Sequence, residues 1–328
     1  MIRALYTFPN TVPDMNFPID EIPQALKNPE GLLWVDFCNE PPETCEPILR
    51  GFGFHPLAID DALAEMHSPK VDDWGNYLYI VLNYNTLKRD NGLLKPDVDE
   101  LDVFLGPNYV VTHHDLPIKS VDETWNSCQR DDRHTHSGPD HLLYRIIDAL
   151  VMDYMPLVEQ IDAEIDELED QVFSKPSHDT LERLFGLKRV LLAMRRILTP
   201  QREVLNKLAR DDYSVIDSKD RVFFRDIYDH LVRLHDLNES MRDMVGGALD
   251  SYLSVINNRM NDIMKTLTVI TTLFMPISFI AGFFGMNFFE PVAHLTDWTS
   301  LSAFYVTMAI VILTPIIMII WMRRKTFL

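Results

Sequence analysis

The sequence has 328 residues, a length typical of about two domains. Its 49 acidic residues against 30 lysines and arginines give a formal charge of −19, which excludes nucleic acid as the main partner because nucleic-acid-binding surfaces are basic. Hydrophobic residues make up 47% of the chain, too many for a disordered protein, and three cysteines are too few for a disulfide-stapled secreted scaffold.

The first 118 residues have the pattern of an α/β domain. Gly106-Pro107-Asn108 predicts a hairpin between two short runs, and Asp90-Asn91-Gly92 predicts a turn. Pro56 can occupy the first position of a helix over residues 56–66. Short apolar, β-branched or aromatic runs predict strands at residues 32–37, 77–84, 101–105 and 109–114.

Long helices follow this domain. Apolar residues at helical spacing indicate helices over residues 140–173 and 177–208, with Pro156 and Pro200 as expected interruptions. A third helix begins near Asp220 and has no firm stop before the membrane, which would make it on the order of 100 Å long. A single helix of that length cannot bury its own apolar face, so we expect several copies of the chain to assemble around an axis.

Two stretches near the C-terminus contain no Asp, Glu, Lys or Arg: residues 266–289, with 24 residues, and residues 298–322, with 25. About 20 apolar residues span the core of a bilayer, which predicts membrane spans at about 266–284 and 302–322. Buried core helices are the alternative, but both stretches exceed the ~10–14 residues typical of such helices.

The residues that flank the two spans predict their orientation. Two basic residues, Arg259 and Lys265, precede the first span, a run of three follows the second, and the connecting residues 287–301 contain none. The positive-inside rule therefore places both termini in the cytoplasm. From Arg259 onward there are five basic and three acidic residues, a charge of +2, which leaves −21 on the cytoplasmic residues 1–258.

Positions spaced every three to four residues along the first span form one seam of small, amide, hydroxyl and methionine side chains, with a period near that of a helix bundle. The seam consists of Asn261, Met264, Thr268, Thr271, Met275, Ser278, Gly282 and Gly285. It suits a pore wall, and it suits equally the close packing of membrane helices. Neither span carries a charge, which favours passive conduction of an ion that keeps its water, such as Mg²⁺.

Several segments resemble, in order along the chain, the CorA family of divalent-cation channels. Phe284-Gly285-Met286-Asn287, at the outer end of the first span, resembles the Gly-Met-Asn signature of that family. The other matching segments are residues 55–61, 69–71 with 77–82, 200–205, 224–226 and 264–282.

The resemblance implies a homopentamer in which the α/β domains form a funnel and the long helix lines both funnel and pore. It implies that Gly285-Met286-Asn287 is the selectivity filter, with a ring of Asn287 amides around a hydrated cation. Asn261 would form a polar ring on the cytoplasmic side, and Met264 and Leu267 a hydrophobic gate. The further pore-lining positions would be Thr271, Met275, Ser278 and Gly282.

The resemblance also implies a regulatory Mg²⁺ site between subunits. Asp61, with its neighbour Asp60, would face Asp226 on the long helix of an adjacent subunit, and Asp250 would be a further acidic position. Bound Mg²⁺ would hold a closed, symmetric ring. When cytosolic Mg²⁺ falls, the carboxylates would repel one another and the ring would loosen.

The outer loop departs from the family pattern. It keeps two acidic residues, Glu290 and Asp297, that can attract cations, but it adds His294. Imidazole suits Zn²⁺, Ni²⁺ or Co²⁺ better than Mg²⁺, so a Zn²⁺ transporter of the same superfamily, including a proton-coupled one, is the alternative. A second His-rich segment, residues 134–141, reads as a polar loop.

Together these patterns predict an α+β membrane protein with a cytoplasmic α/β domain at residues 1–118, a long-helix stalk at 119–264, and two transmembrane helices within 265–328 joined by an external loop at 285–301. We expect a multi-pass protein of the inner (plasma) membrane, in contact with lipid, that passes Mg²⁺ and also Co²⁺ or Ni²⁺. A membrane-anchored metal sensor that does not conduct is a second class of function. An enzyme is disfavoured, because the sequence has no Gly-rich phosphate loop, H-E-x-x-H or G-x-S-x-G motif.

Overall fold

The computed structural model describes the chain except residues 9–10, 65–66, 91, 131–136, 287–299 and 325–328. It divides into two compact units, Met1–Asp250 and Ser251–Leu328. The strands are β1 (Ile2–Thr7), β2 (Leu32–Cys38), β3 (Lys70–Asp73), β4 (Leu78–Asp90), β5 (Leu93–Leu105) and β6 (Tyr109–His114). The α-helices are α1 (Ile22–Ala25), α2 (Pro42–Gly51), α3 (Pro56–Leu63), α4 (Lys119–Arg130), α5 (Pro139–Met152), α6 (Tyr154–Ser174), α7 (His178–Arg210), α8 (Arg221–Phe284) and α10 (Leu301–Arg324).

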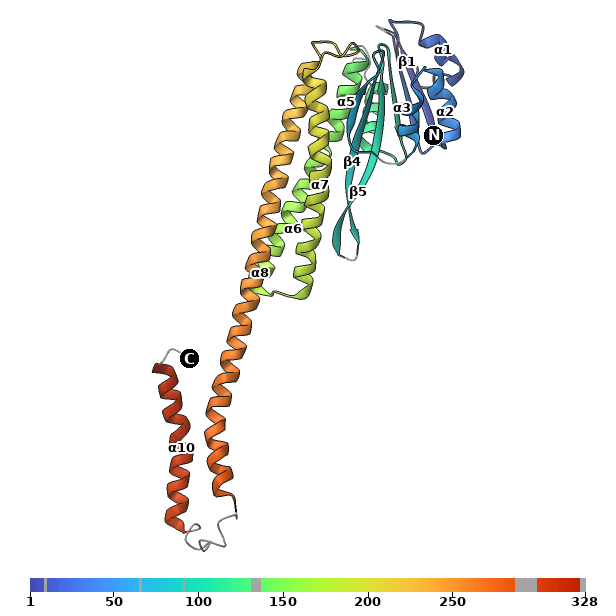
Figure 1. Ribbon diagram of the computed structural model, residues 1–328. Coiled ribbons are helices and arrows are strands. Elements are labelled where there is room, and N and C mark those ends of the chain that lie inside the picture. Colours follow the sequence, from blue (N-terminus) through green and yellow to red (C-terminus); the bar gives the residue numbers. More distant parts are fainter. Residues whose placement is uncertain (9–10, 65–66, 91, 131–136, 287–299, 325–328) are drawn as a thin grey trace. The chain divides into compact units, whose positions relative to one another are not determined.

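The first unit is built on one mixed sheet with the strand order β1-β2-β6-β5-β4-β3 (Figure 1). Among the strands that the structure describes, β2 and β6 pair in parallel and the other neighbours are antiparallel. Every residue of β6 is buried, and so is β2 up to Phe37. Strands buried on both faces read as continuous apolar runs, which is why these two were recognisable in the sequence.

Helices cover both faces of the sheet. On one face, the apolar residues of α1, α2 and α3 form a core with Val35, Phe37 and Phe104. On the other face, the rings of Trp34 and Trp125 of α4 lie 4.9 Å apart. There the backbone N–H of Asn83 in β4 donates to Gln201 of α7 (3.2 Å). The sheet is therefore held between short helices and the long helices of the stalk (Figure 1).

The predicted strands are confirmed in place, but two of them are longer than the apolar runs. β4 and β5 form a hairpin that extends to the Asp90–Leu93 pair, where the turn was predicted. The hairpin past Tyr84 is partly exposed, so apolar patterning does not mark it. Two short strands at the sheet edges, β1 and β3, were not predicted, nor were α2 and α4; edge strands form through pairing with a neighbour rather than through local pattern.

The helices also differ from expectation in where they are interrupted. The break predicted at Pro156 falls instead at Asp153, between α5 and α6. Pro156 lies in the first turn of α6, where its missing N–H removes no helical hydrogen bond. The break predicted at Pro200 is absent because α7 continues through it; the buried Leu198 and Gln201 hold the helix on both sides. The helix predicted over residues 56–66 ends at Leu63.

The second unit contains the C-terminal part of α8 and the whole of α10. Both helices are long and apolar enough to cross a membrane, and α8 runs unbroken through Pro276. Their apolar side chains, including Phe274 and Phe279, are exposed in the single chain, as expected for surfaces that meet lipid or another subunit. The predicted class, an α+β membrane protein with a long stalk helix and two apolar C-terminal helices, is confirmed.

Candidate functional site

The two acidic residues at the end of the 55–61 segment lie on α3. His55 caps this helix: its Nδ1 accepts a hydrogen bond from the N–H of Leu57 (3.2 Å). The apolar side of the helix, including Ala58 and Ile59, is buried against the sheet. The helix therefore leaves Asp60 exposed and Asp61 half-buried.

Asp61 is paired within its own subunit. Lys70 Nζ lies 2.5 Å from Asp61 Oδ2 and 3.0 Å from Asp72 Oδ2. His67 Nε2 lies 3.9 Å from Asp61 Oδ1. Burial disfavours the charged amine, but hydrogen bonds to the two carboxylates outweigh it and raise the pKa of Lys70. Asp61 thus faces a permanent positive charge.

A second, buried acidic group lies next to Asp61, around a cavity of about 60 Å³. Tyr79 Oη donates to Asp102 Oδ1 (2.6 Å), and His113 Nδ1 lies 3.6 Å from Asp102 Oδ2. Burial, reinforced by the charge of Asp102, raises the pKa of Glu100 to about 8, and burial also raises the pKa of Asp102. These two carboxyls hold a proton that exposed carboxyls would release.

The acidic residues predicted on the long helix lie on α8. The Asp226 side chain is 67% exposed, and its Oδ2 lies 4.0 Å from His230 Nε2 one turn along the helix. Burial raises the pKa of Asp148 on α5, and the negative charge of Asp226 adds to this effect. The positive charges of His230 and Arg145 oppose it. Asp250 is exposed. Sequence reasoning missed Asp148 and His230; the i,i+4 spacing of Asp226 and His230 was the available signal.

The predicted pore residues lie on α8 and at its end. All the residues expected to line the pore or to form the gate are exposed in the single chain: Asn261, Met264, Leu267, Thr271, Met275, Ser278 and Gly282. Thr268 Oγ1 donates to Met264 O (2.8 Å), and Thr271 Oγ1 donates to Leu267 O (2.9 Å). Because the hydroxyl protons are used in this way, the oxygen lone pairs remain as acceptors.

The filter segment is only partly within the described residues. Gly285 N donates to Ala281 O (3.0 Å) and Met286 N to Phe283 O (3.3 Å), which closes the last turn of the helix. Asn287, Glu290 and Asp297 lie outside the described residues, as do His134, His136 and His294.

Oxygen ligands dominate the candidate cation-binding residues. Asp61, Asp148 and Asp226 offer carboxylates of the kind that Mg²⁺ prefers. The imidazole of His67 lies 3.9 Å from Asp61, and that of His230 lies 4.0 Å from Asp226. Among the described side chains, no group of three or more His, Cys, Asp or Glu is arranged to hold a metal ion.

Comparison with known proteins extends these observations to the whole chain. The sequence model of the CorA-like Mg²⁺ transporter proteins matches residues 29–324. The chain is 36% identical over 282 residues to the cobalt/magnesium transport protein CorA of Thermotoga maritima, covering 84% of this chain and 78% of that protein. It is 26% identical over 272 residues to the zinc transport protein ZntB of Yersinia enterocolitica, covering 81% and 80% of the two chains.

The fold is that of a solved relative. The complete structure of the CorA magnesium transporter of Methanocaldococcus jannaschii aligns with a TM-score of 0.81 at 22% identity, covering 99% of this chain and 98% of that one. The family match over nearly the whole chain agrees with this fold and with the two apolar C-terminal helices. The chain therefore belongs to the CorA family of divalent-cation transporters, which are membrane proteins and not enzymes.

Proposed function

We propose that this protein is a channel that passes Mg²⁺, and also Co²⁺ or Ni²⁺, across the plasma membrane, and that cytosolic Mg²⁺ bound between subunits closes it. The match of residues 29–324 to the CorA-like family carries this proposal. The functional assembly is a homopentamer whose termini are cytoplasmic. Residues 1–118 and 119–264 form its cytoplasmic part, and residues 265–328 its membrane part.

The chemistry of the seam supports conduction of a hydrated ion. Waters around a divalent cation point their hydrogens outward and therefore need acceptors along the pore. Thr268 and Thr271 can provide them, because their hydroxyl protons are bonded to backbone carbonyls of the same helix. No charged side chain lies in the seam between Thr266 and Phe284 to trap the ion.

In this proposal the filter is Gly285-Met286-Asn287, with Asn287 amides bonded to the ion's hydration shell and Glu290 and Asp297 attracting cations outside it. Met264 and Leu267 form the hydrophobic gate at the cytoplasmic end of the seam, next to the polar ring of Asn261. The regulatory ions lie between Asp61, with Asp60, of one subunit and Asp226 of the next. Asp250 forms a further acidic position, and Asp148 and His230 complete the surroundings of Asp226.

Flux into liposomes tests the proposal. The purified full chain should conduct Mg²⁺, and Asn287→Ala should abolish Mg²⁺ flux while its oligomer elutes as the wild type does. Asn126→Ala, at an exposed position of α4, is the matched control and should conduct normally. Undiminished flux through Asn287→Ala would contradict the filter assignment.

A Zn²⁺ transporter is the second candidate, because the chain also resembles a zinc transport protein at 26% identity. Mg²⁺, Zn²⁺, Ni²⁺ and Co²⁺ should be compared in the same liposomes, with and without a proton gradient. Zn²⁺ uptake that depends on the gradient, with no Mg²⁺ flux, would favour this candidate. Metal-dependent assembly with no flux of any ion would indicate a sensor instead.

A further inference from the structure

Asp61 has a cation of its own chain beside it. Lys70 Nζ lies 2.5 Å from Asp61 Oδ2 and 3.0 Å from Asp72 Oδ2. The same nitrogen lies 5.2 Å from the centre of the Tyr79 ring, within reach of a cation–π interaction. Asp72 and the Tyr79 ring thus hold the ammonium group beside the Asp61 carboxylate.

Strand geometry explains this placement. Lys70 begins β3 and pairs with Val81 of β4, while Asp72, two residues further, lies on the same face of the strand. The side chains of Lys70 and Asp61 are 31% and 34% exposed, so solvent screens their attraction less than it screens a fully exposed pair. The ion pair is therefore a fixed feature of the edge of the sheet.

The carboxylates on α8 have no comparable partner. Asp226 is mostly exposed, and the nearest cationic group that the structure shows for it is His230 at 4.0 Å. Within the described ranges of the chain, Asp60 and Asp250 form no ion pair. Among the four proposed regulatory carboxylates, Asp61 alone is neutralised by a lysine in the described part of the chain.

We propose that Lys70 is a tethered competitor for the Asp61 carboxylate and so raises the Mg²⁺ concentration at which the regulatory site fills; this inference rests on the proposed function. An entering ion must displace the ammonium group from Asp61, and Asp72 retains that group. Without Mg²⁺, Lys70 offsets part of the repulsion between Asp61 and the acidic helix of a neighbouring subunit. The Lys70–Asp61 pair therefore lowers the affinity of the regulatory site for Mg²⁺. It also reduces the repulsion between subunits that follows when Mg²⁺ is lost.

Limited proteolysis of the full chain in detergent, across a Mg²⁺ titration, measures this effect apart from conduction. Lys70→Met leaves Asp61 unpaired, so the midpoint of Mg²⁺ protection should shift to a lower concentration by about two- to fivefold, the factor that a partly exposed ion pair contributes. Lys70→Arg keeps the pair and should stay near the wild-type midpoint. Lys70→Gln repeats the test should Lys70→Met misfold.

Lys95→Met is the matched control. It removes a lysine whose Nζ lies 2.6 Å from Asp90 Oδ2 at the tip of the hairpin, and it should leave the midpoint unchanged. An unchanged midpoint in both Lys70→Met and Lys70→Gln, with protection lost in Asp61→Asn, would overturn the role of Lys70 and leave the regulatory site standing. An Asp61→Asn variant that titrates as the wild type does would overturn the regulatory assignment of Asp61, and this inference with it.

Discussion

Glu100 and Asp102 are two carboxyls of β5 that share one buried site. Their positions i and i+2 place them on the same face of the strand. Tyr79 and His113 contact Asp102, while the backbone N–H of His67 donates to Glu100. Two such groups cannot both ionise readily when they are buried together, and this is why the pKa of each is raised.

The site predicts a pH dependence of stability. The pKa of Glu100 is raised from 4.5 to about 8. The neutral Glu100 carboxyl therefore contributes to the free energy of unfolding in full below about pH 4.5, and this contribution is lost as the pH rises through about 8. Thermal unfolding of the full chain in detergent should therefore show a falling Tm between about pH 5 and about pH 8.5. Glu100→Gln keeps the shape of the neutral carboxyl and cannot ionise. The Tm of this variant should therefore fall less over the same range and should exceed the wild-type Tm at the higher pH.

Glu43→Gln, on the exposed side of α2, is the control for the loss of one carboxylate and should follow the wild-type slope. Equal slopes in the wild type and Glu100→Gln would show that Glu100 is ionised in the folded protein.

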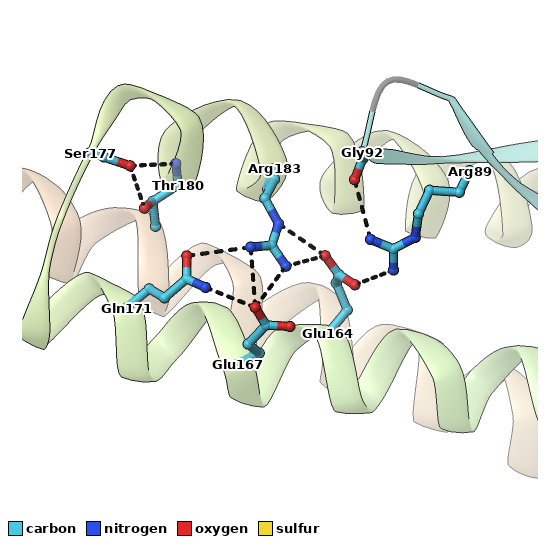
Figure 2. Close-up of polar contacts among 8 residues, drawn as sticks. All are labelled: Arg89, Gly92, Glu164, Glu167, Gln171, Ser177, Thr180 and Arg183. Carbon is cyan, nitrogen blue, oxygen red and sulfur yellow. Dashed lines mark hydrogen bonds and ion pairs between the residues drawn. The ribbon is translucent and has the colours of Figure 1, made fainter.

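At the scale of elements, the β4–β5 hairpin is joined to the helical stalk by an ion-pair network (Figure 2). Glu164 of α6 accepts from Arg89 of the hairpin (2.7 Å) and from Arg183 of α7 (2.5 Å). Figure 2 shows Arg183 reaching also to Glu167 and Gln171, so one guanidinium ties α6 to α7. The hairpin and the two stalk helices α6 and α7 are thus joined through the buried carboxylate of Glu164.

Glu164→Gln should destabilise the full chain. The Glu164 side chain is only 7% exposed, and an amide in its place removes the charge and turns an N–H group toward the arginines. Hydrogen bonds to charged groups contribute about 1.5–3 kcal/mol, so we expect a loss of about that size in thermal unfolding. Glu167→Gln, at the exposed rim of the same network, should cost less than about 1 kcal/mol. Equal costs would contradict the central role of Glu164.

A second element-scale prediction concerns the seam of α8. Thr271 and Thr272 are adjacent and chemically identical, but only Thr271 lies on the seam. If the seam lines a pore, Thr271→Val removes one hydrogen-bond acceptor for the water around the ion. The loss of one such hydrogen bond should reduce Mg²⁺ flux several-fold. Thr272→Val should leave the flux unchanged. Flux in liposomes checks this. Equal flux in the two variants, with weaker oligomers in Thr271→Val, would instead favour the packing role of the seam.

For the whole molecule, charge is the dominant property. The chain carries a charge of −19 and its first 258 residues carry −21, so copies of the chain in the proposed ring would repel one another. Ions that neutralise this charge should hold the ring together. This long-range effect is distinct from the local Lys70–Asp61 pair, because it depends on the sum of all charges.

Removing Mg²⁺ with EDTA at low ionic strength should therefore loosen the assembly. We expect faster proteolysis and a larger hydrodynamic radius, because the acidic surfaces are then unscreened. Adding NaCl to about 0.5 M shortens the Debye length to a few ångströms and should partly restore the compact assembly. A radius that is indifferent to both EDTA and salt would contradict the role of cations as structural counterions.

Local pattern alone was enough to predict the membrane part. An uncharged apolar run of about 20 residues has few alternatives to a membrane helix, since every backbone group in lipid must be bonded within the segment. The same holds for β2 and β6, whose apolar runs reflect burial on both faces. The break predicted at Pro200 is wrong because tertiary packing overrides the local preference of proline. Buried neighbouring residues keep α7 helical through this position.

Polar partnerships could not be predicted in this way. Sequence periodicity indicates which face of an element is buried, but not which element packs against that face. Lys70 and Asp61 are in contact because β3 lies at the sheet edge beside α3. Asp148 interacts electrostatically with Asp226 because α5 packs near α8. Hence the class of protein and its membrane helices follow from residue order alone, whereas the neighbours that tune each carboxylate come from long-range packing, because electrostatic interactions depend on distances that only the assembled fold sets.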